Sequence, residues 1–274
     1  MIITALVENS SISKEYIHKH GLCLHIQTAK HNILFDVGPD DTFLHNAERL
    51  HIDIKAVDLV IISHGHKDHG GGLKAFLAHN DKAKIYIRRQ AFDAYYASLF
   101  KYLKVYVGLE PELRAHNRMV FTEDLHPIDE ELTLVSNITG GELTPNGNRS
   151  LLVKDKHTYA LDGFQHEQHL LLQEKGKTIL ISGCSHTGIV NILQECEEKA
   201  GLKIDCVVGG LHLYNPISKK TEGTRFINEL GAKLHSKNVE IYTCHCTGPK
   251  AFELLRKALG NQISSLKTGQ VIDL

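Results

Sequence analysis

Short apolar runs separated by polar, glycine-containing segments dominate the first third of the chain. Runs of this length that are apolar almost throughout are typical of strands buried on both faces, as in the parallel sheets of α/β proteins. Glycines at 70–72 stand at the start of a segment that predicts a helix over 71–79. The pattern predicts strands over 2–7, 22–27, 32–36, 57–62 and 84–88.

The second half of the chain shows a clearer alternation of strands and helices. Two apolar runs, 170–173 and 178–182, flank Glu174-Lys175-Gly176 and predict a hairpin. The segment 189–200 repeats apolar residues at helical spacing and predicts a helix. Strands that alternate with helices in this way predict an α/β fold. The remaining elements expected here are strands at 206–208 and 239–242, helices at 221–236 and 249–259, and closing strands within 263–272.

The middle of the chain is the least regular part. Aromatic and aliphatic residues at helical spacing predict a helix over 90–101 whose apolar face packs into the core, with an aromatic substrate patch as the alternative. Within 103–165 we expect short strands near 119–121 and 132–136. The segment 137–150 is rich in Gly, Asn, Thr and Pro, which predicts a long loop.

Four side chains that commonly bind metal ions lie within six residues directly after the strand at 57–62. They are His64, His66, Asp68 and His69. In an extended loop His64 and His66 point to the same side and can share one ion, whereas Asp68 and His69 can serve a second. A chain with 19 histidines forms some clusters by chance, but the strand-to-loop context favours a metal site. Imidazole and carboxylate ligands suit zinc best, and also manganese or iron.

Three later strands each lead to a histidine. The sequences that follow them are Gly183-Cys184-Ser185-His186, Gly209-Gly210-Leu211-His212 and Cys244-His245-Cys246. Ligands at the ends of successive strands can converge at one edge of a sheet. We expect His186 and His245 to bind metal and His212 to contact the substrate or orient a ligand. Cys184 is an open alternative as a ligand, because a thiolate there would bind zinc strongly.

Composition and charge are those of an ordinary globular protein. With 274 residues, of which 42% are hydrophobic and 23% charged, the chain can bury a sizeable core, so we expect one domain over 1–274 with a loop-rich insertion near 103–165. A formal net charge of −1 with scattered basic residues argues against a broad nucleic-acid interface. The N-terminus has no basic leader or cleavage pattern, and no apolar run approaches the ~20 residues of a membrane span. We therefore expect a cytoplasmic protein with a small-molecule substrate and no membrane partner.

Most of the other titratable and thiol side chains are expected to have structural roles. The six cysteines should be reduced, since a chain with a good core needs no disulfides, and Cys196 and Cys206 should be small buried hydrophobes. Cys244 and Cys246 flank His245 in a loop that belongs to the expected site. The histidines expected at the surface or in local pairs are His18, His20, His25, His31, His45, His51, His79, His116, His126, His157 and His235.

The run from Ser63 to Gly72 resembles the signature of the metallo-β-lactamase superfamily. Further motifs along almost the whole chain are similar to one subgroup of metal-dependent hydrolase-like proteins, which includes the archaeal dihydropterin ribofuranosylaminobenzene phosphate synthase. The resemblance implies a four-layer αββα sandwich with the metal site in a groove along one sheet edge. The further motifs are Leu6-Val7-Glu8-Asn9, Leu34-Phe35-Asp36-Val37-Gly38, Gly183-Cys184-Ser185-His186, Gly209-Gly210-Leu211-His212-Leu213 and Cys244-His245-Cys246-Thr247-Gly248.

The resemblance also implies a ligand set that this chain matches only in part. In the superfamily a third histidine precedes the hairpin, an aspartate after its second strand bridges the metals, and a final histidine closes the site. His245 fits the last role, whereas Cys184 stands nearest the place of the aspartate, with His186 two residues on. Asp36, at the end of a strand, would orient a ligating histidine through its second nitrogen. The candidates for the third-histidine place are His166, Glu167 and His169.

The chemistry predicted from these residues is metal-dependent hydrolysis. Two divalent ions would provide a metal-bound hydroxide, with Asp68 binding one ion and accepting a hydrogen bond from that hydroxide, for attack on a phosphoester, phosphodiester or related small anionic substrate. One alternative is a transferase that joins a dihydropterin to a ribofuranosylaminobenzene phosphate, and a second is a non-catalytic metal-binding sensor or redox partner. The chain has no Gly-x-Ser-x-Gly elbow for a serine nucleophile. The aromatic residues available for a pterin are Phe92, Tyr95, Tyr96, Tyr159 and Phe164.

Overall fold

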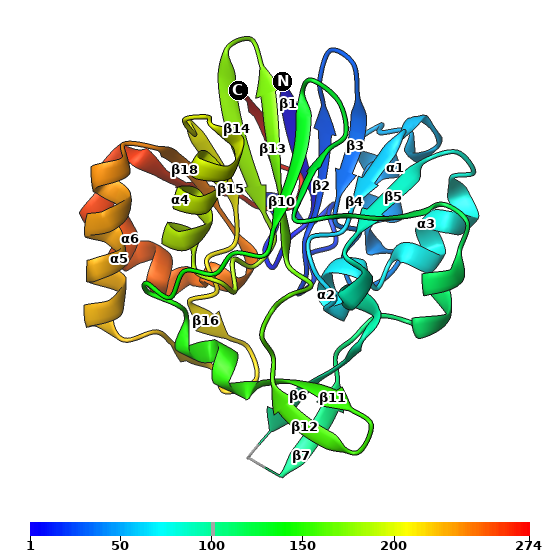
Figure 1. The fold of residues 1–274 in the computed structure, drawn as a ribbon. Coiled ribbons are helices and arrows are strands. Elements are labelled where there is room, and N and C mark those ends of the chain that lie inside the picture. Colours follow the sequence, from blue (N-terminus) through cyan, green and yellow to red (C-terminus); the bar gives the residue numbers. More distant parts are fainter. Residues whose placement is uncertain (100–101) are drawn as a thin grey trace. The chain divides into compact units, whose positions relative to one another are not determined.

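A computed structural model describes residues 1–99 and 102–274, which form two compact units (Figure 1). The N-terminal amino group donates a hydrogen bond to the carbonyl oxygen of Leu274 at 2.9 Å, and both ends of the chain belong to unit 1. Unit 1 comprises Met1–Tyr95, Tyr106–Thr122 and Leu266–Leu274, and unit 2 comprises Tyr96–Val105 and Glu123–Ser265.

Unit 1 contains a seven-stranded sheet in its described part, in the order β20-β1-β2-β3-β4-β5-β8. The pairs from β20 to β3 are antiparallel and those from β3 to β8 are parallel. Helices α1 (Thr42–Arg49) and α3 (Leu73–His79) contribute Phe43 and Phe76 to a buried core that includes Val60 of β4. The strands are β1 (Ile2–Val7), β2 (Cys23–Gln27), β3 (Asn32–Phe35), β4 (Leu59–Ile61), β5 (Lys84–Ile87), β8 (Met119–Phe121) and β20 (Val271–Asp273).

Unit 2 contains a second seven-stranded sheet among the described residues, in the order β19-β18-β15-β14-β13-β10-β9. The strands from β14 to β19 run parallel, and those from β9 to β14 antiparallel. Leu180 and Val207 of the sheet belong to one buried core with Ile192, Leu230 and Leu255 of the helices α4, α5 and α6. The elements are β9 (Leu125–Pro127), β10 (Leu132–Ser136), β13 (Gln168–Glu174), β14 (Lys177–Ser182), β15 (Cys206–Gly209), β18 (Glu240–Thr243), β19 (Ile263–Ser265), α4 (Ile189–Ala200), α5 (Thr224–Lys237) and α6 (Pro249–Leu259).

Local signals explain why two helices of unit 2 begin and end where the sequence predicted. Helix α4 ends before Gly201, which has φ 67° in the left-handed conformation that glycine adopts at least cost. Helix α6 begins at Pro249, whose missing N–H is not needed in the first turn of a helix. The predicted hairpin is also confirmed, as β13 and β14.

The helix predicted over 90–101 is wrong in the described part of that segment. Arg89–Phe92 form a short 3-10 helix (η2), and Ala94–Leu99 form strand β6. Tyr95 and Ala97 are buried while the residues next to them are partly exposed, which is the two-residue period of a strand. Consecutive aromatic residues satisfy both periods, and tyrosine favours strands. Residues 100 and 101 of that prediction lie outside the described residues.

The remaining elements were not predicted from the sequence. Strand β6 lies in a four-stranded sheet of order β12-β11-β6-β7, and β16 pairs with β17. The four-residue helix α2 spans Lys67–Gly70. The bounds are β7 (Leu103–Tyr106), β11 (Leu151–Asp155), β12 (Thr158–Leu161), β16 (Tyr214–Asn215), β17 (Lys220–Thr221), and the 3-10 helices η1 (Ile54–Ala56), η3 (Pro111–Ala115), η4 (Asn146–Ser150), η5 (His245–Thr247) and η6 (Gly260–Gln262).

Two further expectations concern thiols and membranes. The six cysteines are buried, and none forms a disulfide within the described ranges 1–99 and 102–274. Among the helices of those ranges, none has the length and apolar character that crossing a bilayer would require.

A leucine pair tests the importance of the unit 2 core. Leu180 lies on β14 between β13 and β15 and is fully buried, whereas Leu161 is 65% exposed. We expect Leu180→Ala to lower the free energy of unfolding by about 2–5 kcal/mol, because it removes buried methyl groups and leaves a cavity. Leu161→Ala should change it by less than about 0.5 kcal/mol. Urea unfolding of both variants measures this, and equal losses would contradict the assignment of the core.

Candidate functional site

The histidine loop, residues 64–69 of unit 1, lies directly after β4 and leads into α2. His64 and His69 have no exposed surface, and His66 is 5% exposed. The ring centroid of His64 lies 4.6 Å from that of His66 and 4.1 Å from that of His69. The structure thus brings the three imidazoles of the motif into one compact, buried group of nitrogen donors.

Asp36 orients His69. The carboxylate of Asp36, just beyond β3, accepts a hydrogen bond from Nδ1 of His69 at 2.6 Å, and two more from the backbone nitrogen and Oγ of Ser63 at 2.7 and 2.8 Å. Because Nδ1 carries the proton of this bond, Nε2 is the nitrogen of His69 that can bind a metal ion. This contact agrees with the role that the family resemblance implied for Asp36.

Ser63 extends the hydrogen-bond network of Asp36 to His64. The single hydroxyl proton of Ser63 is donated to Asp36, so the bond of 2.9 Å between Ser63 Oγ and Nδ1 of His64 must be donated by the imidazole. His64, like His69, therefore presents Nε2 as its possible ligand atom. One buried carboxylate in this way sets the tautomer of two histidines.

The glycines of the motif permit close packing of the backbone around the loop. A Cβ atom at Gly65 would lie 2.4 Å from the carbonyl oxygen of Ala91, and one at Gly71 would lie 2.3 Å from that of Pro39. Gly71 has φ −63°, a value open to any residue, so size rather than backbone conformation requires glycine there. Steric contact with neighbouring backbone atoms is therefore the reason for glycine at both positions.

Asp68 is the most accessible of the four candidate ligands in the histidine loop. Its side chain is 25% exposed, and Oδ2 lies 3.3 Å from Nε2 of His20 and 3.8 Å from Nε2 of His69. The sequence gave no reason to single out His20, which was expected to be a surface residue and is 42% exposed. Its contact with Asp68 adds an imidazole at the open side of the loop.

A second group of donors lies in unit 2 and is called the Cys–His cluster: Cys184, His186, His212, His245 and Cys246. These residues follow β14, β15 and β18, which are parallel neighbours, so their carboxyl ends lie at one edge of the sheet. All five are buried. The ligand atoms of Cys184, His186 and His212 lie within 4.8 Å of one another, as do those of Cys184, His245 and Cys246.

Cys246 was not predicted as a donor, although the sequence placed it beside His245. Its sulfur accepts a hydrogen bond from the backbone nitrogen of His212 at 3.2 Å, and a Cβ atom at Gly210 would lie only 2.5 Å from it. Burial alone would raise the pKa of the Cys246 thiol, but the nearby side chains of Cys184 and His212 and the charge of His245 lower that pKa well below its usual range. The cluster therefore favours sulfur as an anion.

His186 is fixed by side chains that the sequence did not reveal. Nδ1 of His186 donates to Oδ1 of Asn148 at 3.0 Å, while Nδ2 of Asn148 donates to the carbonyl oxygen of His186 at 2.7 Å. The ring of Phe164 stacks on the imidazole with centroids 4.4 Å apart and an interplanar angle of 8°. These contacts leave Nε2 as the nitrogen of His186 that can bind a metal ion.

The three candidates for the third-histidine place make local contacts in unit 2. His166 donates from Nε2 to Asp162 at 3.0 Å, and His169 forms a 3.0 Å bond through Nδ1 with Ser182. Burial lowers the pKa of His169, so its imidazole is neutral at neutral pH. Glu167 accepts hydrogen bonds from the backbone nitrogens that follow Ser185, those of His186 at 2.6 Å and Thr187 at 3.0 Å. Glu167 therefore shapes the loop that carries His186.

Strained backbone conformations occur at His212 and His245 of the Cys–His cluster and at two residues next to it. Phe164, Ser185, His212 and His245 all have positive φ angles, of 52°, 58°, 48° and 50°. Residues other than glycine adopt this region at a cost, and such residues concentrate at functional sites. The surrounding structure therefore holds the donors in place at the expense of some stability.

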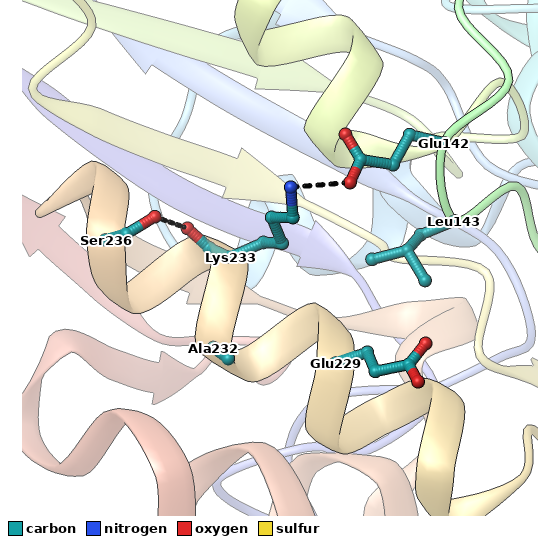
Figure 2. Close-up of a pocket in the computed structure, with 6 residues that line it drawn as sticks. All are labelled: Glu142, Leu143, Glu229, Ala232, Lys233 and Ser236. Atoms are coloured by element: carbon teal, nitrogen blue, oxygen red, sulfur yellow. Dashed lines mark hydrogen bonds and ion pairs between the residues drawn. The ribbon is translucent and has the colours of Figure 1, made fainter.

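A cavity of about 540 Å³ lies beside His212 in unit 2. The 3-10 helix η4, the segment His212–Asn215 and the strand β17 supply residues of its wall. A second hollow, of about 710 Å³, lies between α5 and the segment before η4 (Figure 2). There Lys233 pairs with Glu142 at 2.7 Å, and none of the metal-ligand candidates lines it. Of these two hollows, the cavity beside His212 is the one lined by a member of the Cys–His cluster.

Comparison with known proteins identifies relatives along the whole chain. The chain is 28% identical over 267 residues to an uncharacterised protein of Methanocaldococcus jannaschii, with 93% of each covered. It is 26% identical over 297 residues to 7,8-dihydropterin-6-methyl-4-(β-D-ribofuranosyl)-aminobenzene-5'-phosphate synthase of the same organism, covering 99% of this chain and 95% of the relative.

A solved structure and a family model agree with these relatives. The crystal structure of a metal-dependent hydrolase of the β-lactamase superfamily is 29% identical, with a TM-score of 0.81 and coverage of 100% of this chain and 99% of the other. The predicted metallo-β-lactamase fold is thereby confirmed. The family model matches residues 19–158, which include the histidine loop. The chain belongs to the metallo-β-lactamase superfamily.

Proposed function

We propose that the protein is a metal-dependent hydrolase of a phosphoester, phosphodiester or related small anionic substrate. The observation that carries the proposal is the buried trio His64, His66 and His69, with His69 oriented by the carboxylate of Asp36. A structural role alone would not require three clustered imidazoles with two of their tautomers set by one hydrogen-bond network. Membership of a superfamily whose solved relative is a metal-dependent hydrolase supports the same proposal.

The donor atoms fit divalent metal ions. In the histidine loop the proposed ligands are nitrogen atoms of His64, His66 and His69 and an oxygen atom of Asp68, a set that zinc, manganese and iron accept. In the Cys–His cluster we propose His186 and His245 as ligands. The sulfur atoms of Cys184 and Cys246 in the same cluster favour zinc over the other two metals. We therefore propose two divalent ions, with zinc as the better fit.

Asp68 is the proposed catalytic residue. Bound divalent ions would lower the pKa of a coordinated water molecule toward about 7 and would act as Lewis acids. The carboxylate of Asp68 is partly exposed and lies at hydrogen-bonding distance from His20, so it can hold a water molecule and accept its proton. Asp36 would hold His69 in one orientation during this reaction, because the three hydrogen bonds of Asp36 are fully buried.

A transferase is the second candidate function. This alternative is supported by the M. jannaschii relative that is named as a 7,8-dihydropterin-6-methyl-4-(β-D-ribofuranosyl)-aminobenzene-5'-phosphate synthase. That relative is 26% identical to this chain over an alignment that covers 99% of it. Flat partners need aromatic contacts, and in unit 2 Phe164 lies stacked on His186 while Tyr96 and Tyr159 form an edge-to-face pair. Titration of the metal-loaded protein with a dihydropterin tests it, and a dissociation constant in the millimolar range or weaker would count against it.

A non-catalytic sensor or redox partner is the third candidate. The reason for this candidate is the Cys–His cluster, in which Cys184 stands nearest the place that the family resemblance assigns to a bridging aspartate. Metal analysis of the purified protein, combined with a screen of phosphodiester, lactone and thioester substrates, separates this candidate from the enzymes. Turnover of any of these substrates that requires metal would exclude it.

Metal removal and a histidine pair test the hydrolase. We expect chelation to abolish turnover, and His66→Ala to lose bound metal together with activity, because it removes one of three clustered nitrogen donors. The matched control is His79→Ala, an exposed residue of α3 whose loss should leave metal content and turnover unchanged. Elemental analysis and initial rates measure both. Full activity after complete demetallation would overturn the proposal.

His212→Ala should behave differently from His66→Ala. His212 lines the cavity of about 540 Å³, which suits contact with a substrate. If it contacts substrate or orients a ligand, metal content stays near that of the parent while turnover falls by ~10 to 100-fold. The measurements are metal stoichiometry and kcat on the same preparations. A loss of one equivalent of metal would instead make His212 a ligand.

Asp36→Asn tests the orientation of His69. Asparagine keeps the size of the side chain but weakens its acceptance of three hydrogen bonds, so we expect metal affinity to fall by about 10 to 100-fold. Asp53→Asn, which changes a carboxylate that accepts a bond from the backbone nitrogen of Lys55 elsewhere in unit 1, is the matched control and should leave affinity unchanged. Competition with a chelating dye measures both affinities. Equal affinities in the two variants would contradict the role of Asp36.

A further inference from the structure

Two cationic side chains, Arg149 and Lys220, line the cavity beside His212 in unit 2. Arg149 belongs to η4 and Lys220 to β17, so two separate segments of the chain bring positive charge to one hollow. Both residues are exposed, and within the described part of the chain neither side chain takes part in an ion pair. Uncompensated cations around a concave surface attract an anionic ligand.

Glu222 contributes a carboxylate to the cavity wall, and this carboxylate forms hydrogen bonds with η4. Its Oε1 accepts hydrogen bonds from the backbone nitrogens of Asn146 and Gly147 at 2.6 and 3.2 Å, and its Oε2 accepts one from Nδ2 of Asn146 at 3.1 Å. Glu222 thereby ties η4 to the segment after β17. These bonds fix the position of η4 and occupy both carboxylate oxygens of Glu222.

His212 supplies a buried polar group in the same wall. It is 8% exposed, lines the cavity, and has φ 48°. Neither ring nitrogen has a hydrogen bond of good geometry to a described residue, although the ring lies close enough to Cys246 to lower the pKa of that thiol. A buried imidazole in this state costs free energy that a ligand in the cavity can recover. Gly147 leaves room beside it, since a Cβ atom there would lie 3.2 Å from Nε2 of His212.

We propose that this cavity binds a phosphate group by which the protein recognises its substrate, with Arg149 and Lys220 as the cationic contacts and His212 as a hydrogen-bonding group in the wall. The planar guanidinium of Arg149 matches two oxygen atoms of a phosphate, and Lys220 adds a point charge. A volume of about 540 Å³ lies in the range of small-molecule sites and leaves room for the organic part of the ligand. This assignment rests on the proposed function and names its substrate class: a phosphorylated small molecule.

Titration with inorganic phosphate tests the cationic contacts in the metal-loaded protein. We expect Arg149→Gln and Lys220→Gln each to raise the dissociation constant by about 10-fold or more, because each removes a charge-assisted contact. The matched control is Lys203→Gln, an exposed lysine of unit 2 outside the cavity, which should bind phosphate like the parent. Calorimetry measures all four proteins. Parent-like affinity in both cavity variants would overturn the proposal.

The His66→Ala variant separates phosphate in the cavity from phosphate at the histidine loop. We expect His66→Ala to keep phosphate binding, and the double variant with Arg149→Gln to lose it. This result would support the cavity even if the protein proved to have no hydrolase activity. Phosphate binding that disappears in His66→Ala but survives in Arg149→Gln would instead overturn the inference, because the anion would then depend on the histidine loop.

Methylphosphonate distinguishes a substrate phosphate from the free ion. Its carbon–phosphorus bond resists hydrolysis, and its methyl group stands for the organic part of a substrate. We expect it to bind the parent about as tightly as inorganic phosphate and to lose affinity in Arg149→Gln and Lys220→Gln. Binding of inorganic phosphate without binding of methylphosphonate would mean that the cavity takes the free ion, which contradicts the proposal.

Discussion

The parallel pairing of strands in the two sheets is the constraint on which the candidate site depends. Parallel neighbours end at the same edge, so residues that directly follow them are brought together whatever their own chemistry. In unit 2 this applies to β14, β15 and β18, whose ends carry the Cys–His cluster. In unit 1 it applies to β3 and β4, whose ends carry Asp36 and the histidine loop. Buried aliphatic side chains fix these registers, and the donors themselves contribute little to them.

Burial of the donor groups has an unfavourable free energy, which hydrogen bonds to other polar groups offset. Burying a carboxylate such as that of Asp36 is unfavourable unless hydrogen bonds replace its water, and Asp36 has three such bonds. Asn148 and Glu167 do the same around His186, through its ring, its carbonyl oxygen and its backbone nitrogen. The positive φ angles of His212 and His245 add strain that the packed strands hold in place. Rigidity of the donors is thus a property of their neighbours.

Patterns within one segment could be predicted from the sequence, and contacts between distant segments could not. Helices α4 and α6 and the hairpin β13–β14 follow from apolar periodicity, glycine and proline, which act locally. The histidine loop is also local, because its ligands lie within six residues. Strand β6 was mistaken for a helix because adjacent aromatic residues fit both periods and pairing with β11 and β7 decides between them.

The residues that the sequence missed share a physical reason. His20 and Asn148 act through contacts with Asp68 and His186 that span 48 and 38 positions, so no local pattern marks them. The sequence shows Cys246 only as a neighbour of His245. Its place among the donors depends on contacts of its sulfur with Gly210 and His212, which lie far away in the chain.

The two donor groups differ in chemical softness, and this difference bears on selectivity for metals. Nitrogen and oxygen donors, as in the histidine loop, bind several divalent ions with affinities that follow the general order of the transition metals. Sulfur donors with a lowered pKa, as Cys246 has, favour softer metals, zinc among them, over manganese. Because His212 belongs to the Cys–His cluster and also lines the cavity with Arg149 and Lys220, a ligand in that cavity would contact the donor group that is the more selective for zinc. If the cavity binds an anion and the cluster binds a metal ion as proposed, the single side chain of His212 would link the two.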